Sequence, residues 1–268
     1  MIFYGPSSQD YDIDIGPVLL TDWYHKDYYD LVAEYVGTDL SILPFTSDNN
    51  LIQGRNSFPC ALSPNTTDPG LGCANNASLS AFKFVPGKTH RLRLINAGTE
   101  GVQKFSIDGH NMTVIAQDYV SVQPFETDLI TLGVGQRTDV LVTASAARGG
   151  SFWMRSTIST GDGCSGSVVT EATAAIFYDG CDTTKAPTSS PNPSYTYDNI
   201  QKCHNDDIST NFVPSAPQPY TTPSVSQNVS VNLVVNATGH FNWELNNVCA
   251  PKLYIRVLCK VRPLKDFL

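Results

Sequence analysis

The sequence contains no closely spaced histidines or cysteines. Its five histidines stand singly, outside any H-x-H or H-C-H motif; they are His25, His90, His110, His204 and His240. No C-x-x-C is present either. A transition-metal site gathers several imidazoles, often with a thiolate, within about 2–2.3 Å of one ion, and closely spaced ligands are its usual trace in a sequence. We therefore expect no metal site in this chain.

Positive charge and long apolar runs are also scarce. The 17 Lys and Arg residues are outnumbered by 25 Asp and Glu, which gives a net charge of −8. Such a field repels a polyanion, so it argues against nucleic-acid binding. No apolar run approaches the roughly 20 residues that cross a bilayer, so no membrane span is expected. With 41% hydrophobic and only 16% charged residues, the composition excludes an intrinsically disordered chain.

The N-terminus lacks the features of a signal peptide. Residues 1–14, MIFYGPSSQDYDID, offer no basic segment followed by an apolar one. Five N-x-S/T glycosylation sequons nevertheless occur, at Asn65, Asn76, Asn111, Asn228 and Asn236. Seven cysteines accompany them, and the odd number leaves at least one thiol unpaired. Sequons and cysteines together indicate an oxidising, secretory history, so we expect an incomplete chain.

Short alternating or β-branched runs dominate the first two thirds of the chain, separated by glycine, proline and asparagine turns. The predicted strands lie at 18–21, 81–85, 90–95, 104–107, 112–117, 121–122, 128–132, 139–143, 152–157 and 174–177. This spacing predicts an all-β sandwich or barrel. In the third of these runs, Leu92 and Leu94 alternate with Arg91 and Arg93, which predicts a strand with one face in water.

Other segments depart from this strand pattern. Residues 26–36 predict the one helix. The loop 56–78 holds Cys60 and Cys73, which we expect to form a local disulfide that offsets the entropy of the loop. Residues 182–226 are rich in Pro, Ser and Thr without periodicity and predict an interdomain linker. Residues 229–235, VSVNLVV, then predict the opening hairpin of another sheet domain.

Two blocks of sequence carry a family resemblance. Residues 4–25, YGPSSQDYDIDIGPVLLTDWYH, and residues 86–142, with PGKTHRLRLINAG, FSIDGHNMTVIAQD and GVGQRTDV, resemble the middle cupredoxin-like domain of ascomycete laccases. The resemblance covers residues 2–247, in family order and spacing. These laccases are secreted multicopper oxidases that oxidise phenols and reduce dioxygen to water. The resemblance implies an all-β, cupredoxin-like Greek-key sandwich or barrel and an extracellular location.

The resemblance also implies a domain organisation. Residues 1–12 would end a preceding cupredoxin domain, 13–181 would form the complete middle domain, 182–226 the linker and 227–247 the truncated hairpin of a third domain. Residues 248–268 resemble no part of the family and would be an unrelated tail.

In laccases the copper ligands come from the first and third domains, in HWHG, HSH, HPxHLHGH and HCHIAWH motifs, and none of these motifs is present. We therefore carry over no copper ligand and no catalytic residue. The expected function is that of a laccase fragment without its first and third domains, inactive alone. A non-catalytic β-sandwich that serves as a binding or interaction module is the alternative.

The resemblance does suggest substrate-binding residues. In the family, a carboxylate on a loop of the middle domain faces the phenol, and INAGTEG places Glu100 at that position. Its role would be to accept the phenolic proton as an electron leaves. The segment Ile42, Leu43, Pro44 and Phe45 resembles an apolar wall of the same pocket.

The remaining cysteines and histidines are assigned as follows. The resemblance implies a disulfide between Cys164 and Cys203, and it leaves Cys181, Cys249 and Cys259 unassigned. The histidines at positions 25, 90 and 110 are expected to be structural, because each would need metal-ligand partners from elsewhere in the chain. His204, next to Cys203, belongs to the one local cluster of possible metal ligands, but that cluster lies on the predicted linker.

Overall fold

The computed structural model describes residues 7–35, 46–62, 73, 75, 77–203, 211–216, 228–235, 241–246 and 248–249. The chain forms two compact units. Unit 1 comprises Met1–His25 and Pro44–Gln218, and unit 2 comprises Lys26–Leu43 and Pro219–Leu268. Strands dominate the described residues, which confirms the all-β prediction.

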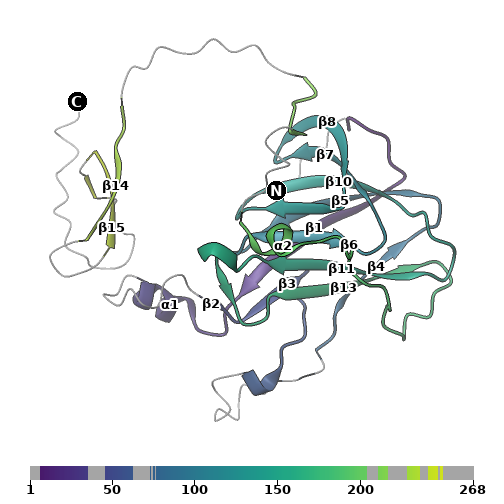
Figure 1. Ribbon diagram of the computed structural model, residues 1–268, viewed down its shortest axis with the longest axis horizontal. Coiled ribbons are helices and arrows are strands. Elements are labelled where there is room, and N and C mark those ends of the chain that lie inside the picture. The colour runs from purple at the N-terminus through teal and green to yellow at the C-terminus, as the bar shows by residue number, and fades with distance from the viewer. Residues whose placement is uncertain are drawn as a thin grey trace. The chain divides into compact units, whose positions relative to one another are not determined.

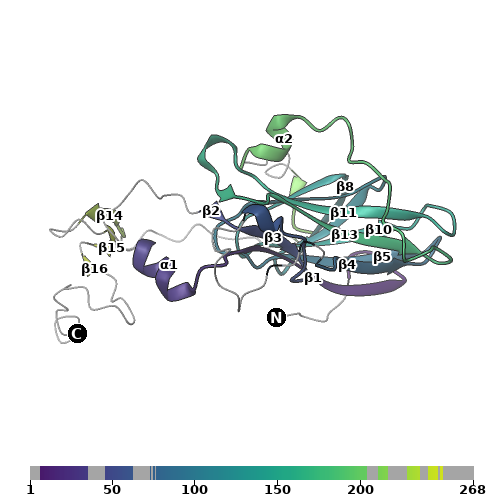
Figure 2. The same cartoon turned by 90° about the horizontal axis from the view of Figure 1, so that it is seen from below.

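Unit 1 is a sandwich of two sheets (Figure 1, Figure 2). The larger sheet has six strands in the order β3-β1-β5-β10-β7-β8, and the smaller has five in the order β4-β13-β11-β6-β9. Neighbours are antiparallel except for β1 with β5 and β4 with β13. The larger sheet consists of Asn49–Ile52 (β3), Ile13–Trp23 (β1), Thr89–Asn96 (β5), Arg137–Thr143 (β10), Met112–Gln117 (β7) and Val120–Thr127 (β8). The smaller consists of Ser80–Phe84 (β4), Glu171–Tyr178 (β13), Ser151–Ile158 (β11), Gln103–Ile107 (β6) and Leu129–Leu132 (β9).

Shorter elements complete unit 1. Two-residue strands, Thr46–Ser47 (β2) and Gly166–Ser167 (β12), pair in parallel. A short helix spans Tyr197–Gln201 (α2), and 3-10 turns lie at Cys60–Leu62 and Gly161–Gly163.

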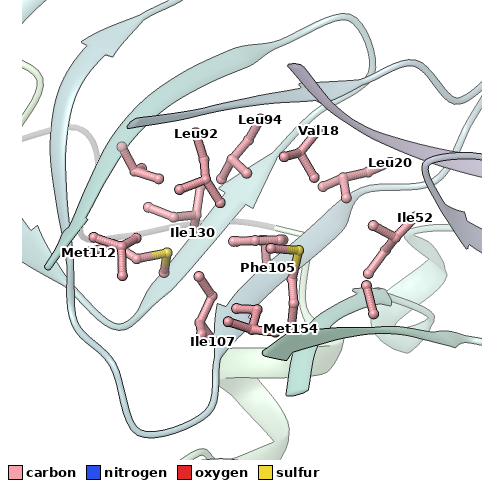
Figure 3. Packing of buried hydrophobic residues seen from close by; sticks show 14 of the residues in the cluster. Val18, Leu20, Ile52, Leu92, Leu94, Phe105, Ile107, Met112, Ile130 and Met154 are labelled. Atoms are coloured by element: carbon pink, nitrogen blue, oxygen red, sulfur yellow. The ribbon is translucent and has the colours of Figure 1, made fainter. Parts of the chain in front are cut away.

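The hydrophobic core lies between the two sheets of unit 1. Leu92 and Leu94 of β5 point into the same space as Phe105 of β6 and Met154 of β11 (Figure 3). All four side chains are fully buried. Because side chains alternate along a strand, every second residue of β5 reaches this space. Burying each such side chain contributes about 1.5–3 kcal/mol to folding, so the core fixes the register of the strands that carry the site.

The outward side of β5 is not the water-exposed face that the alternation predicted. The side chains of Arg91 and Arg93 are only 11% and 7% exposed. Both donate to the carboxylate of Asp139 on β10, and Arg93 also donates to Asp14 on β1. The ring of Tyr11 lies 5.3 Å from the guanidinium carbon of Arg91. Because β5 runs between β1 and β10, neighbouring side chains cover its outward arginines. The alternation in the sequence shows which residues point outward, but it does not show whether side chains or water cover them.

The described chain after β13 stays on unit 1, and residues 182–203 and 211–216 form what we call the strap. The Ser189 hydroxyl group donates to the Asp108 carboxylate at 2.8 Å, and the Tyr195 hydroxyl group donates to the Asp128 carbonyl oxygen at 2.8 Å. The last described part of the strap makes backbone hydrogen bonds with the edge of β8. The segment expected as a linker therefore lies on the sandwich in its described part.

In the described residues, unit 2 contains one helix and a three-stranded sheet. The helix Tyr28–Tyr35 (α1) confirms the expectation at 26–36. The antiparallel pair Val231–Val235 (β14) and Phe241–Leu245 (β15) confirms the expected hairpin. A third strand, Val248–Cys249 (β16), pairs with β15, so the segment expected as a tail begins inside a strand. Among the described helices, none is both long enough and apolar enough to cross a membrane.

Candidate functional site

The loop between β5 and β6 carries Glu100, and it is closed around the carboxylate of Asp22. Asp22 lies near the end of β1 and is 3% exposed. Its two carboxylate oxygens accept hydrogen bonds from the backbone N–H groups of Thr99 at 2.7 Å, Glu100 at 2.8 Å and Gly101 at 2.7 Å. Hydrogen bonds to an ionised acceptor are stronger than neutral ones. The backbone that presents Glu100 is therefore held in one shape.

Small residues allow this close approach. A Cβ atom at Gly98 would lie 3.0 Å from Oδ1 of Asp22 and 3.0 Å from Oδ1 of Asn96. A Cβ atom at Gly101 would lie 3.2 Å from Cγ1 of Ile158. The Asn96 amide group also donates to the Gly101 carbonyl oxygen at 2.7 Å and so closes the loop from its other side. The contact with Asp22 thus accounts for Gly98, and the packing of Ile158 accounts for Gly101.

The surroundings of the loop change the acidity of its side chain. Partial burial raises the pKa of Glu100 above its usual value of 4.5, and the negative charge of Asp22 raises it further. Burial also raises the pKa of Tyr24, with added repulsion from Asp22, Glu100 and Asp48. A carboxyl group with a raised pKa exchanges protons closer to neutral pH, which suits it to accept and release a substrate proton.

Sequence reasoning missed Asp22 and Tyr24 as parts of this site. Both belong to DWYH, which contributed to the family resemblance but received no role. The available signal was a carboxylate at the end of the apolar run VLLTDW, since a buried carboxylate needs hydrogen-bond donors. The expected apolar wall, Ile42 to Phe45, lies outside the described residues.

Both expected disulfides are present. Cys60 is bonded to Cys73, and Cys164 is bonded to Cys203. Cys181 carries a free thiol. The second disulfide closes the strap onto the turn after β11, and the first closes a loop of the larger sheet after β3.

The described histidines make structural contacts inside unit 1, and His90 and His110 share the Phe84 ring as a neighbour. His110 bridges the Asp108 carbonyl oxygen and the Tyr178 hydroxyl group inside unit 1. The buried imidazole of His90 stacks on Phe84 and accepts from the Val85 backbone N–H. The exposed side chain of His25 packs edge-on against a phenylalanine ring. These surroundings agree with the structural roles expected for all three.

The described residues do not fit a copper ion. No three of their His, Cys, Asp and Glu side chains gather as a ligand set, and a copper site needs such a set. The two other histidines, His204 and His240, lie outside the described residues. Of the sequons, Asn111 and Asn228 are described and exposed, and Asn65, Asn76 and Asn236 lie outside the described residues.

The fold and its motifs define the class of protein. The two-sheet sandwich is a cupredoxin-like all-β domain, and the model of the multicopper oxidase family matches residues 14–182. The chain belongs to the multicopper oxidase family. A laccase from Cryphonectria parasitica is 40% identical over 176 residues, which cover 66% of this chain and 27% of the relative. Laccase-2 from Botryotinia fuckeliana is 38% identical over 184 residues, which cover 68% of this chain and 30% of the relative.

Solved structures agree with this assignment. The crystal structure of a laccase from Botrytis aclada has a TM-score of 0.67 and 30% identity, over 91% of this chain and 41% of that one. A multicopper oxidase that functions in iron import has a TM-score of 0.68 at 21% identity, and it shares the fold. The chain spans 24% to 50% of the length of the curated relatives it matches.

Proposed function

We propose that this chain is the middle, phenol-facing part of a laccase-type multicopper oxidase. The single observation that carries the proposal is the Glu100 loop, whose backbone is fixed by Asp22 and whose carboxyl group is partly buried with a raised pKa. In the intact family, phenols are oxidised and dioxygen is reduced to water. Glu100 serves that reaction by taking the proton that a phenol loses when it is oxidised.

The state of the Glu100 carboxyl group sets when this step operates. Only the ionised carboxylate accepts a proton, so the contribution of Glu100 falls as the pH drops through its raised pKa. A phenol is a weak acid, whereas its oxidised radical cation is a strong one. The carboxylate therefore needs no unusual basicity, only a fixed place beside the ring.

The chain alone is proposed to be inactive. Its described residues gather no copper ligand set, so stoichiometric copper and phenol turnover require the domains that supply those ligands in the family. We also propose that the protein is extracellular and that the exposed Asn111 and Asn228 carry glycans.

The test of the Glu100 role uses a chimera in which residues 13–203, with the Cys164–Cys203 disulfide, replace the matching part of the Botrytis aclada laccase. We expect Glu100→Gln to lower kcat/KM for phenols by about 10²-fold and to remove the acid limb of the pH profile. Glu126→Gln, which changes an exposed carboxylate on β8, is the matched control and should leave both unchanged. An unaltered pH profile in Glu100→Gln would reject the assignment.

The test of inactivity uses the 268-residue chain incubated with copper salts. We expect metal analysis to find less than one copper per chain and the visible spectrum to lack the intense copper–thiolate band of a blue site. A stoichiometric, blue, phenol-oxidising chain would contradict the proposal. A chain that contains no copper but binds a partner tightly, without oxidising it, would support the alternative, a non-catalytic binding module.

A further inference from the structure

We propose that Asp22 is a positioning residue for Glu100: its buried carboxylate is the template on which the backbone of residues 98–101 closes, and this fixes where the Glu100 side chain begins. The inference rests on the proposed function of Glu100 and goes beyond it by assigning a role to a second, distant residue. Asp22 and Glu100 are separated by 78 positions in the chain and are brought together by the parallel pairing of β1 with β5.

No other described residue holds the Glu100 side chain. No hydrogen bond or ion pair from a described residue reaches its carboxylate. As far as the described residues go, the place of the side chain is set by its own backbone. That backbone is fixed by consecutive N–H groups at Thr99, Glu100 and Gly101, all of which donate to Asp22 at 2.7–2.8 Å. Three donors on one carboxylate define both the position and the orientation of the loop.

Asp22 also acts on the loop through its charge. Among the described residues, no Lys, Arg or His side chain pairs with this carboxylate. Within the described part of the chain its charge is met by backbone N–H dipoles, so its field acts on the neighbouring loop. By contrast, the carboxylate of Asp139 is neutralised by two arginines. Asp22 therefore supplies acceptors to the loop and a negative charge that no described basic side chain pairs with.

The shape of the loop is fitted to Asp22. With Gly98 and Gly101 the backbone can approach the carboxylate, and a Cβ atom at Gly98 would lie 3.0 Å from it. Described titratable groups near the two carboxylates include Tyr24, Asp48 and His25. Among the described groups, the charge that acts on the Glu100 carboxyl is that of Asp22. Removing the Asp22 charge should therefore move two observables at once, loop order and Glu100 acidity.

The first experiment needs no substitution. Amide hydrogen exchange of the chain by NMR should show Thr99, Glu100 and Gly101 protected about 100-fold or more relative to the exposed turn amide of Thr183, although all four lie outside strands. Exchange of the three loop amides at the rate of Thr183 overturns the proposal. No copper or substrate is present in this measurement.

The second experiment compares Asp22→Asn with Asp118→Asn. Asp118 also accepts a backbone N–H, that of Arg137 at 2.9 Å, so its replacement removes the same charge at a distant turn and leaves an amide oxygen that can still accept this bond. We expect Asp22→Asn to reduce the loop protection at least about tenfold and to lower the pKa of Glu100, and Asp118→Asn to do neither. Unchanged protection and pKa in Asp22→Asn overturn the proposal.

A third variant covers the case in which Asp22→Asn does not fold. Gly98→Ala places a methyl group against the carboxylate and leaves its charge intact. We expect reduced protection of the Thr99, Glu100 and Gly101 amides, and undiminished protection contradicts the template role. These outcomes are separable from the proposed function: a silent Glu100→Gln in the chimera would reject the proton-accepting role and leave the Asp22 results standing.

Discussion

The hydroxyl group of Tyr178 lies 2.6 Å from Nε2 of His110 in the interior of the sandwich. The other ring nitrogen, Nδ1, is 2.8 Å from the Asp108 carbonyl oxygen, which can only accept a hydrogen bond. Nδ1 therefore carries the proton, and Nε2 accepts from Tyr178. The pair fixes a neutral imidazole between β6 and β13.

Removing the Tyr178 hydroxyl group should lower the free energy of unfolding. Tyr178→Phe leaves the buried Nε2 of His110 without a donor, and we expect a loss of about 1–3 kcal/mol in the free energy of unfolding. Urea denaturation followed by fluorescence measures it. Tyr29→Phe, on a ring that is 76% exposed, is the control and should change stability by less than about 0.5 kcal/mol. Equal losses in the two variants would refute the role of the pair.

His110 and His90 should make the stability of the fold depend on pH. Burial lowers the pKa values of His110 and His90 below their ordinary value of 6.5. As the pH falls, the unfolded chain therefore binds these protons before the folded chain does. The stability that the neutral imidazoles contribute is present above pH 6.5 and is lost as the pH falls from 6.5 through the lower pKa of the folded state. We expect the urea midpoint to fall between about pH 8 and pH 5.5, above the range of ordinary carboxylates. A midpoint that is constant or rises toward acid would contradict this.

The two disulfides should contribute unequally. Cys164 and Cys203 are 39 positions apart, whereas Cys60 and Cys73 are 13 apart. The chain-entropy model then gives about 4 kcal/mol for the first and about 3 kcal/mol for the second. The double Cys→Ser replacement at 164 and 203 should lower the free energy of unfolding more than the matched replacement at 60 and 73. The reverse order would show that native contacts of the strap replace the cross-link.

The Asp108 carboxylate joins three elements, because it accepts from Arg155 of β11 at 2.9 and 3.0 Å and from Ser189 of the strap. Its side chain is 1% exposed. Asp108→Ala leaves Arg155 with Glu171 alone, and we expect a loss of about 3 kcal/mol by thermal or urea unfolding. Asp198→Ala, which breaks an exposed pair on α2, should cost less than about 1 kcal/mol. A small loss at Asp108 would mean that water replaces its partners.

The sequence predicted those parts of the molecule that depend on local pattern. The run 90–95 became Thr89–Asn96, and 139–143 became Arg137–Thr143, because alternating apolar residues determine which face of a strand meets the core. The Asp22 site could not be found in this way, since its donors are 77 to 79 positions away. The strap was also missed, because single anchors such as Ser189 and Tyr195 leave no period in the sequence.

The Cys164–Cys203 bond also governs how the molecule responds to force. When the chain is pulled from its C-terminal side, the disulfide at Cys203 transmits the force directly to Cys164. Residues 211–216 lie beyond Cys203 and are held to β8 by backbone hydrogen bonds and by the contact of Phe212 with Phe125. Under tension this end of the strap peels away first, while α2 and the Tyr195 anchor are shielded and the sandwich is loaded only afterwards.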